Sequence, residues 1–433
     1  MNALRARALR LFGDVRPGEA GLALLQLFNL FLLLVAYNIF KTVREPLVLA
    51  TGGAEMKSYA AAAQALALMG FIPLYGWLAA RVDRLQLVTW LLLFFTACVE
   101  LFNLGLRIGV RNLGFVFYVW VGIFSLATIA QFWSFANDLY SKPDGERLFP
   151  LIGIGATLGS PLGSKIAGEL FGAGVKPQDI LHITAALLVV HLTLYHAVSG
   201  RMSRGGGVEV AQGERLLGPG GFALVFRSHY LRLAAVLLVL LNVVNTTGNY
   251  VIDNAVLAAA ARAKAAQPDL DTSAFLGAFY GDYYFWGNIL ALLLQAFVVA
   301  RLVKLAGIAG VLLALPLVSG SAYALIGAGV AFSVARWAKT AENATDYSVM
   351  NTARQMMWLP TTREEKYKAK QTLDTFFVRG GDMLSAGLVF LGTTVFHLGV
   401  PGFAWLNVAL VVIWLVVALL LVRENRRLAA TRA

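Results

Sequence analysis

The stretch GRMSRGGGVEVAQGERLLGPGG, residues 200–221, divides the chain into two parts of similar length. It is the only long glycine-rich polar segment, and six long apolar runs lie on each side of it. The runs are 21–50, 57–81, 86–107, 113–139, 148–172 and 178–199, then 229–260, 273–301, 305–326, 328–352, 371–397 and 399–422. Each can cross a hydrocarbon core of about 30 Å as an α-helix, whereas barrel strands would be short and alternating. The sequence therefore predicts an all-α polytopic membrane protein with twelve transmembrane helices in two six-helix halves.

The composition supports a membrane protein. The chain of 433 residues is 58% hydrophobic and 14% charged, with a mean hydropathy of +0.69. A soluble domain is typically about a quarter charged, and so little polar surface cannot cover a globule in water. The net charge of +12 comes mostly from short gaps between apolar runs, which is typical of topology signals and not of a nucleic-acid surface. The single cysteine, Cys98, excludes an intrachain disulfide.

The distribution of basic residues predicts the orientation. With a cytoplasmic N-terminus, most basic residues fall in cytoplasmic loops, and the outer loops keep only Lys57, Arg107, Arg111, Lys176, Arg262 and Lys264. We therefore expect a multi-pass protein of a bacterial inner (plasma) membrane with both termini in the cytoplasm. The predicted parts are a basic segment 1–20, a helix bundle 21–199, a cytoplasmic linker 200–228, a second bundle 229–422 and a basic tail 423–433.

The two halves resemble each other in sequence. NIFKT at 38–42 in the first span parallels NVVNT at 242–246 in the seventh. ARVDRL at 80–85 after the second span parallels ARLVKL at 300–305 after the eighth. Parallel six-helix halves are the architecture of major facilitator transporters, whose substrate site lies near the middle of the membrane. The repeats therefore predict a major-facilitator-like fold.

Charged residues within the spans indicate where a polar site would lie. A charge at the centre of a spanning helix costs about 3 kcal/mol or more unless it is paired or hydrated. The spans nevertheless contain Lys41, Arg44, Glu45, Glu100, Lys165, Asp253, Asp282, Arg336, Lys339, Glu342, Arg379 and Asp382. In the seventh span, Asn242, Asn245, Thr246, Asn249 and Asp253 share one helical face. Such faces must line a wet cavity or a contact between helices.

Two roles are open for these residues. In the first, basic residues grip the phosphate or carboxylate groups of an anionic substrate. The predicted substrate-binding set is Lys41, Arg44, Lys165, Asn245, Asn249, Asp253, Asp282, Tyr283, Arg336, Lys339 and Arg379. In the second, the charges form salt bridges for gating and packing, a role that we assign to Glu45, Asp144, Arg147, Glu342 and Asp382.

The remaining sequence features indicate packing and predict neither a catalytic nor a metal site. The aromatic run FYGDYYFW at 279–286 could stack on a planar ring or fill space between helices. Gly153, Gly155, Gly159 and Gly163 are typical of close helix packing. The sequence contains no Walker motif, HExxH or GxSxG, and its histidines have no metal-ligand spacing. It therefore predicts a carrier without a cofactor or metal, and not an enzyme.

Several segments resemble the ATP/ADP translocase (nucleotide transporter) family, which is related to the major facilitator superfamily. They are FWSFAN at 132–137, DGERLFPLIGIGA at 144–156, DYSVMNTARQMMWLP at 346–360, KYKAK at 366–370, YNIFKTVREPLV at 37–48 and SAFLG at 273–277. The resemblance covers most of the chain. Members of this family exchange nucleotides, mostly ATP for ADP and phosphate, or import nucleotides with protons.

The resemblance implies roles for three residues. At a fourth position the chain departs from the family's pattern. The family's critical basic residue of the first span falls on Arg44, and its acidic residues near the fourth and seventh spans fall on Asp144 and Asp253. Its lysine of the eleventh span has no clean match, because Arg379 and Asp382 occupy that region. We therefore expect an ATP/ADP-type, ATP-binding antiporter working by alternating access. One alternative is a proton-coupled symporter of another phosphorylated or anionic metabolite, and another is a non-transporting membrane receptor or accessory subunit.

Overall fold

The computed structural model describes residues 16, 19–79, 81–202 and 220–432. Most of the predicted N-terminal segment 1–20 and the middle of the predicted linker lie outside the described residues. The predicted C-terminal tail is helical as far as Arg432, because the last helix continues through it.

Contacts divide the chain into two compact units. Unit 1 comprises Met1–Val48, Gly70–Gly213 and Ser273–Phe285, and unit 2 comprises Leu49–Met69, Glu214–Thr272 and Trp286–Ala433. Each unit thus contains most of one half of the sequence together with a short segment of the other half. The predicted bundles 21–199 and 229–422 stay a prediction, since their limits are membrane crossings and not packing contacts.

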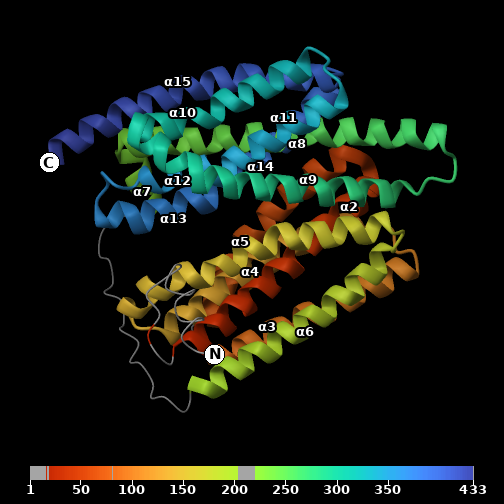
Figure 1. Cartoon of the computed structure of the whole chain (residues 1–433). Helices are drawn as coiled ribbons and strands as arrows, with labels where there is room; N and C mark the ends of the chain where they lie inside the picture. The colour runs from red at the N-terminus through yellow and green to blue at the C-terminus, as the bar shows by residue number, and fades with distance from the viewer. Residues whose placement is uncertain (1–15, 17–18, 80, 203–219, 433) are drawn as a thin grey trace. The chain divides into compact units, whose positions relative to one another are not determined.

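The helices of the first half are α2 (Ala20–Ala79), α3 (Arg84–Arg107), α4 (Leu113–Leu139), α5 (Lys142–Gly172) and α6 (Pro177–Met202). Local sequence sets two of their starts. The Asp83 side chain accepts hydrogen bonds from the backbone N–H groups of Leu85 and Gln86, and that of Ser141 accepts from Asp144. In unit 1, α3 lies alongside α6 (Figure 1).

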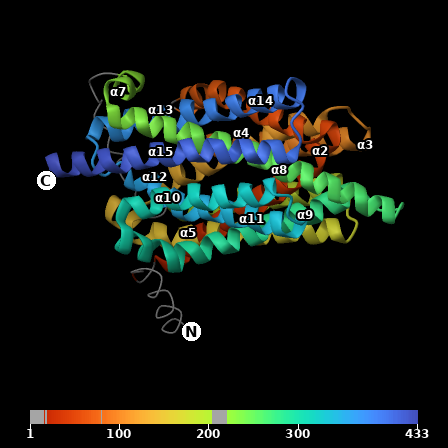
Figure 2. The same ribbon diagram turned by 90° about the horizontal axis from the view of Figure 1, so that it is seen from above.

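The rest of the chain forms a longer series of helices, several of them interrupted by π-helical turns. They are α7 (Gly221–Arg227), α8 (His229–Ala266), α9 (Thr272–Leu293), η1 (Leu294–Val299), α10 (Ala300–Gly327), α11 (Phe332–Thr345), η2 (Asp346–Met350), α12 (Asn351–Met356), η3 (Glu365–Ala369), α13 (Lys370–Thr372), η4 (Leu373–Phe377), α14 (Val378–Thr394) and α15 (Val400–Arg432). In unit 2, α15 packs on both α8 and α10 (Figure 2).

The predicted all-α membrane fold is confirmed. Among the described residues, seven helical stretches are long and apolar enough to span a membrane, but Ala20–Ala79 and Thr272–Gly327 have 60 and 56 residues. At about 1.5 Å per residue, either is more than twice as long as one crossing needs. Their backbones break at Gly52–Gly53 and at Gly307, so each has room for the two crossings that the sequence predicts there. The other predicted crossings correspond to the more polar helices α5, α11–α12 and η3–α14, which are not among these seven stretches.

Glycines bring α5 into backbone contact with α2 in unit 1. A Cβ atom would lie 2.2 Å from the Leu27 carbonyl oxygen if built on Gly155, and 2.5 Å from that of Phe31 if built on Gly159. Gly163 is equally close to Val35, at 2.4 Å, whereas Gly153 has open space within 4 Å. Three of the four glycines predicted to pack closely therefore do so.

We expect Gly159→Ala to destabilise the protein, whereas Gly153→Ala should not. The new methyl group at position 159 must push α5 away from α2, and overpacking of this kind costs about 1–3 kcal/mol. At Gly153 the methyl group enters open space and slightly favours the helix. The two unfolding temperatures, measured in the same detergent, test this. Equal values for both variants would contradict the close contact between α2 and α5.

Candidate functional site

A cationic cluster lies on α2 in unit 1. The Arg44 guanidinium lies over the Tyr118 ring at 4.3 Å from its centroid, and Arg44 Nε donates a hydrogen bond to Glu45 Oε1 at 3.0 Å. The Arg44 side chain is 12% exposed and that of Glu45 is fully buried. Arg44 is thus a nearly buried cation that an aromatic face and a carboxylate hold in place.

The tyrosine Tyr284 of α9 joins two residues of this cluster. Lys41 Nζ lies 4.2 Å from the centroid of the Tyr284 ring, and the Tyr284 hydroxyl donates a hydrogen bond to Glu45 Oε1 at 2.8 Å. The structure therefore brings the predicted residues Lys41, Arg44 and Glu45 together. We call Lys41, Arg44, Glu45, Tyr118 and Tyr284 the α2 cluster.

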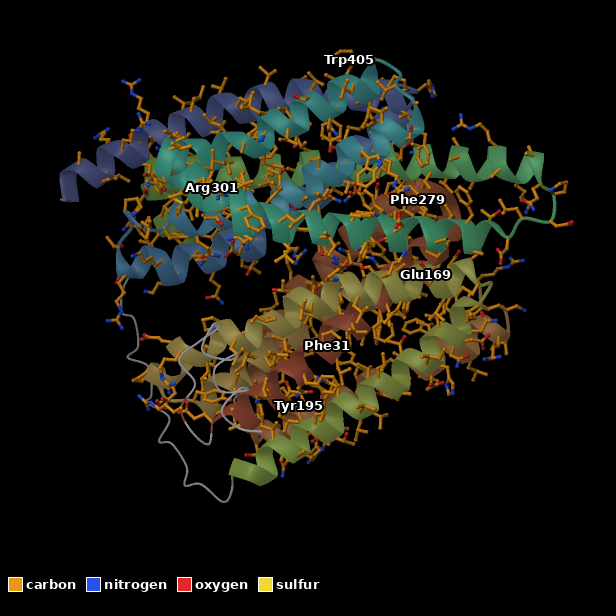
Figure 3. All side chains as sticks on the ribbon, viewed as in Figure 1. Phe31, Glu169, Tyr195, Phe279, Arg301 and Trp405 are labelled. Carbon is orange, nitrogen blue, oxygen red and sulfur yellow. The ribbon has the colours of Figure 1, made fainter. Side chains whose placement is uncertain are left out.

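Three further predicted residues of unit 1 lie on α5 and α9. Lys165 forms an ion pair with Glu169 at 2.7 Å, and Asp282 interacts electrostatically with the same lysine. Tyr283 is 3% exposed and stacks on Phe279, so its ring fills space inside the protein. Figure 3 labels Glu169 on α5 and Phe279 on α9.

A contact between two glycines fixes α9 against α5. A Cβ atom built on Gly281 would lie 2.3 Å from the Cα atom of Gly168. No side chain larger than hydrogen fits between the two backbones there. This contact sets the position of the neighbouring Tyr284, which belongs to the α2 cluster.

Unit 2 contains a buried polar network around Lys339 of α11. Its ammonium group contacts the Glu342 carboxylate, the Tyr323 hydroxyl at 3.0 Å and Asn245 Oδ1 at 3.4 Å. Tyr323 in turn donates to Glu342 Oε1 at 2.8 Å, and the amide of Asn245 donates to Asp346 at 3.3 Å. The Lys339 and Glu342 side chains are 0% and 4% exposed. The network joins α8, α10 and α11 through groups that satisfy one another.

A second polar group of unit 2 lies between α8 and α14. Asp382 accepts hydrogen bonds from Asn242 at 2.7 Å and Thr246 at 3.2 Å, and it pairs with Arg379 at 3.4 Å. Both groups adjoin π-helical turns, since Asp346 begins η2 and Arg379 follows η4. Such turns are frequent at functional sites.

The remaining predicted residues of unit 2 are dispersed. Asp253 is 1% exposed and forms an ion pair with Lys57 at 2.7 Å. Lys57 is itself nearly buried, although the charge pattern places it in an outer loop. Asn249 is half-buried on α8, and Arg336 is half-buried with its guanidinium 5.5 Å from the centroid of the Trp337 ring. The roles assigned to these residues stay predictions.

An ion-pair cluster lies at the start of α5, outside the spans. Arg147 contacts Glu19 at 3.0 Å and Asp144 at 2.6 Å. The hydrogen bond from Arg147 lowers the pKa of Glu19, and hydrogen bonds from Ser141 and Arg147 lower the pKa of Asp144. Because both pKa values are lowered, the stabilisation is present at neutral pH and is lost as the pH falls through these lowered values. The cluster ties the start of α2 to α5.

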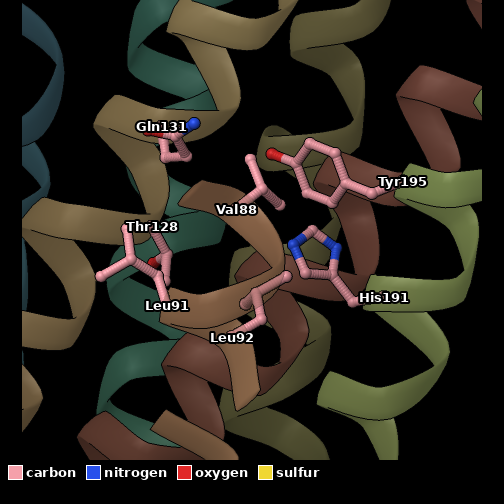
Figure 4. Close-up of a pocket in the computed structure, with 7 residues that line it drawn as sticks. All are labelled: Val88, Leu91, Leu92, Thr128, Gln131, His191 and Tyr195. Atoms are coloured by element: carbon pink, nitrogen blue, oxygen red, sulfur yellow. The ribbon is translucent and has the colours of Figure 1, made fainter. Parts of the chain in front are cut away.

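A small cavity in unit 1 surrounds His191 (Figure 4). Val88, Leu91, Leu92, Thr128, Gln131, His191 and Tyr195 line it, and it offers about 10 Å³ to the centre of a water-sized sphere. That is room for about one water molecule. His191 is 1% exposed, and its Nδ1 atom lies 3.1 Å from the Asn29 carbonyl oxygen. The described residues contain no group of three or more His, Cys, Asp or Glu side chains suited to a metal ion.

Comparisons with known proteins show a relative by sequence. No protein-family profile matches the chain. ADP,ATP carrier protein 1 of Chlamydia trachomatis serovar D is 22% identical over 358 residues, which cover 70% of this chain and 64% of that protein. The chain thus spans less than two thirds of that relative's length.

Solved transporter structures share the fold. The nucleoside transporter NupG aligns over 94% of this chain and 98% of its own, with a TM-score of 0.64 and 14% identity. A bacterial homologue of the iron transporter ferroportin aligns over 94% and 99%, with a TM-score of 0.67 and 13% identity. The chain is thus similar in sequence to an ADP,ATP carrier and shares its fold with solved transporter structures. An auto-inhibited peptide transporter of the POT family is also similar, with a TM-score of 0.62 and 14% identity over 93% of this chain and 97% of its own.

The resemblance to ADP,ATP carriers and the major-facilitator-like fold are therefore confirmed. Sequence reasoning found the cations of the α2 cluster, and it singled out Tyr284 only as part of the aromatic run 279–286. It missed Tyr118 and Tyr323, because aromatic residues are common in every span. It also missed the pairing of Lys57 with Asp253. The only signal for that pair was a lysine close to a long apolar helix.

Proposed function

We propose that this relative of the ADP,ATP carriers is a transporter of the bacterial inner membrane, with both termini in the cytoplasm. It exchanges nucleotides, ATP against ADP, by alternating access. The observation that carries the proposal is the α2 cluster, in which Lys41 and Arg44 lie one helical turn apart and each rests on a tyrosine ring. The distant identity with a protein named as an ADP,ATP carrier supports the substrate class.

The chemistry of the cluster suits a phosphorylated substrate. Arginine and lysine form charge-assisted hydrogen bonds with phosphate oxygens, and these are about twice as strong as neutral ones. The Arg44 side chain is 12% exposed, so little water screens the contact. Its guanidinium is held over the Tyr118 ring, and a cation fixed in this way loses little conformational freedom on binding.

Strict exchange is expected if the bound substrate neutralises the positive charges of the α2 cluster. A bound polyphosphate neutralises Lys41 and Arg44, and the loaded protein can then change conformation. The empty protein keeps an excess of positive charge in a low-dielectric region and resists the return step. A ligand can shift a conformational equilibrium only by its difference in affinity for the two states, and the α2 cluster would supply that difference.

The test uses purified protein in liposomes loaded with unlabelled ADP, with labelled ATP added outside. Uptake that requires internal nucleotide supports exchange. Uptake that needs no internal nucleotide and stops with a protonophore supports the proton-coupled alternative, with Asp253 or Asp282 as the proton site. ATP binding without uptake or counterflow supports the receptor alternative. If ATP neither binds nor enters, the nucleotide assignment is wrong and other anionic metabolites replace it.

A further inference from the structure

We propose that the Glu45 carboxylate is an internal competitor of the anionic substrate for Arg44, and that the Tyr284 hydroxyl holds this carboxylate once the substrate has bound. This inference rests on the proposed function only in taking an anion as the ligand of Arg44. It assigns an affinity-setting role to Glu45 and a positioning role to Tyr284.

Two side chains already occupy parts of the Arg44 guanidinium, so a substrate can reach only what is left. Its Nε atom donates to Glu45 Oε1 at 3.0 Å, so a carboxylate already occupies one edge of the guanidinium. The ring of Tyr118 covers one face of the same group, at 4.3 Å from the centroid. An incoming anion must therefore share the charge and the remaining donors of Arg44 with Glu45.

Burial makes this competition strong. The Glu45 side chain is fully buried and that of Arg44 is 12% exposed, so water can replace neither partner effectively. A buried carboxylate that loses its partner is costly unless another donor remains. The carboxylate of Glu45 thus opposes the departure of Arg44 toward a substrate.

Tyr284 is a donor of this kind. Its hydroxyl lies 2.8 Å from the same oxygen of Glu45, and the side chain is 9% exposed. Its ring packs against Tyr280 and Tyr283, with centroids 5.9 and 5.5 Å away, and the adjacent Gly281 contacts Gly168. The hydroxyl is therefore held in place independently of Arg44. When an anion binds Arg44, Glu45 keeps this hydrogen bond.

The test measures ADP binding to the full-length protein in detergent by calorimetry. We expect Glu45→Gln to tighten ADP binding about tenfold, because a neutral amide no longer competes for Arg44. We expect Tyr284→Phe to weaken it about tenfold, since a hydrogen bond to a charged group is worth about 1.5–3 kcal/mol and the bound state depends on it more than the empty state. In the double variant the Tyr284→Phe effect should vanish, because no carboxylate remains to be held.

The double variant separates competition from a general charge effect or a folding defect. If Glu45 acts only through its charge, Tyr284→Phe weakens ADP equally in both backgrounds, and the proposal is overturned. Glu100→Gln, which removes a carboxylate bonded to His182 at 2.8 Å, is the matched control and should leave ADP affinity unchanged. Tyr230→Phe, which removes a buried hydroxyl bonded to Met357, is the second control.

Pyrophosphate distinguishes this inference from the proposed function. If pyrophosphate binds and ADP does not, nucleotide exchange fails, and the same five variants measured with pyrophosphate decide the role of Glu45. If neither anion binds the wild-type protein, both the nucleotide proposal and the competition at Arg44 are overturned.

Discussion

The Arg44→Ala variant is expected to lose all measurable nucleotide exchange while remaining folded in the membrane. Arg44 is the cation of the α2 cluster that stacks on Tyr118, and a phosphate would bind it through charge-assisted hydrogen bonds. Loss of one such bond costs about 1.5–3 kcal/mol, or about tenfold to a hundredfold in affinity. Because a polyphosphate uses several donors of one guanidinium, the combined loss should exceed the range of a liposome assay.

Two further variants show that this loss reflects binding and not misfolding. Arg44→Ala breaks the ion pair of Arg44 with the buried Glu45, so Arg44→Ala combined with Glu45→Gln removes both charges of that pair and should fold well but still not transport. Arg107→Ala is the matched control, since Arg107 forms an exposed ion pair with Asp179 and should be dispensable. Exchange at the wild-type rate by Arg44→Ala would refute the assignment of the α2 cluster as the substrate site.

The second large effect is expected for stability. Glu342→Gln should destabilise the protein by about 3–5 kcal/mol, because it leaves the fully buried ammonium of Lys339 without its counter-charge. The Tyr323 hydroxyl and Asn245 remain near Lys339 but carry no negative charge, and Asp346 interacts with Lys339 electrostatically from behind Asn245, without an ion-pair contact. A lower unfolding temperature of the purified variant, followed by tryptophan fluorescence, would show this.

The double variant Lys339→Met with Glu342→Leu tests whether the lost charge pairing of Lys339 causes the destabilisation. Replacing both members of a buried ion pair by apolar groups of similar size is often neutral or even stabilising. We expect this variant to recover most of the stability that Glu342→Gln loses. If the double variant is as unstable as the single one, the hydrogen bonds of Tyr323 and Ser319 to Glu342 matter more than the charge pair.

The candidate site could be predicted only in part. Lys41, Arg44 and Glu45 were found because a charge inside a membrane span is rare and lies within one turn of its neighbours. For Lys339, sequence reasoning predicted a substrate contact, and the structure places it in a buried network with Glu342, Tyr323 and Asn245. A charge pattern shows that a partner is needed, but it does not show whether that partner is a substrate or another side chain.

The sequence by itself determined the all-helical membrane fold. The hydropathy of about twenty consecutive residues is a local property, and it predicts long apolar helices without reference to the rest of the chain. Tertiary structure alone decided the partners of the buried charges. Glu45 meets Tyr284 across 239 residues, and Lys57 meets Asp253 across 196. Such pairs depend on how helices pack and turn against one another, and no local pattern of the sequence records that rotation.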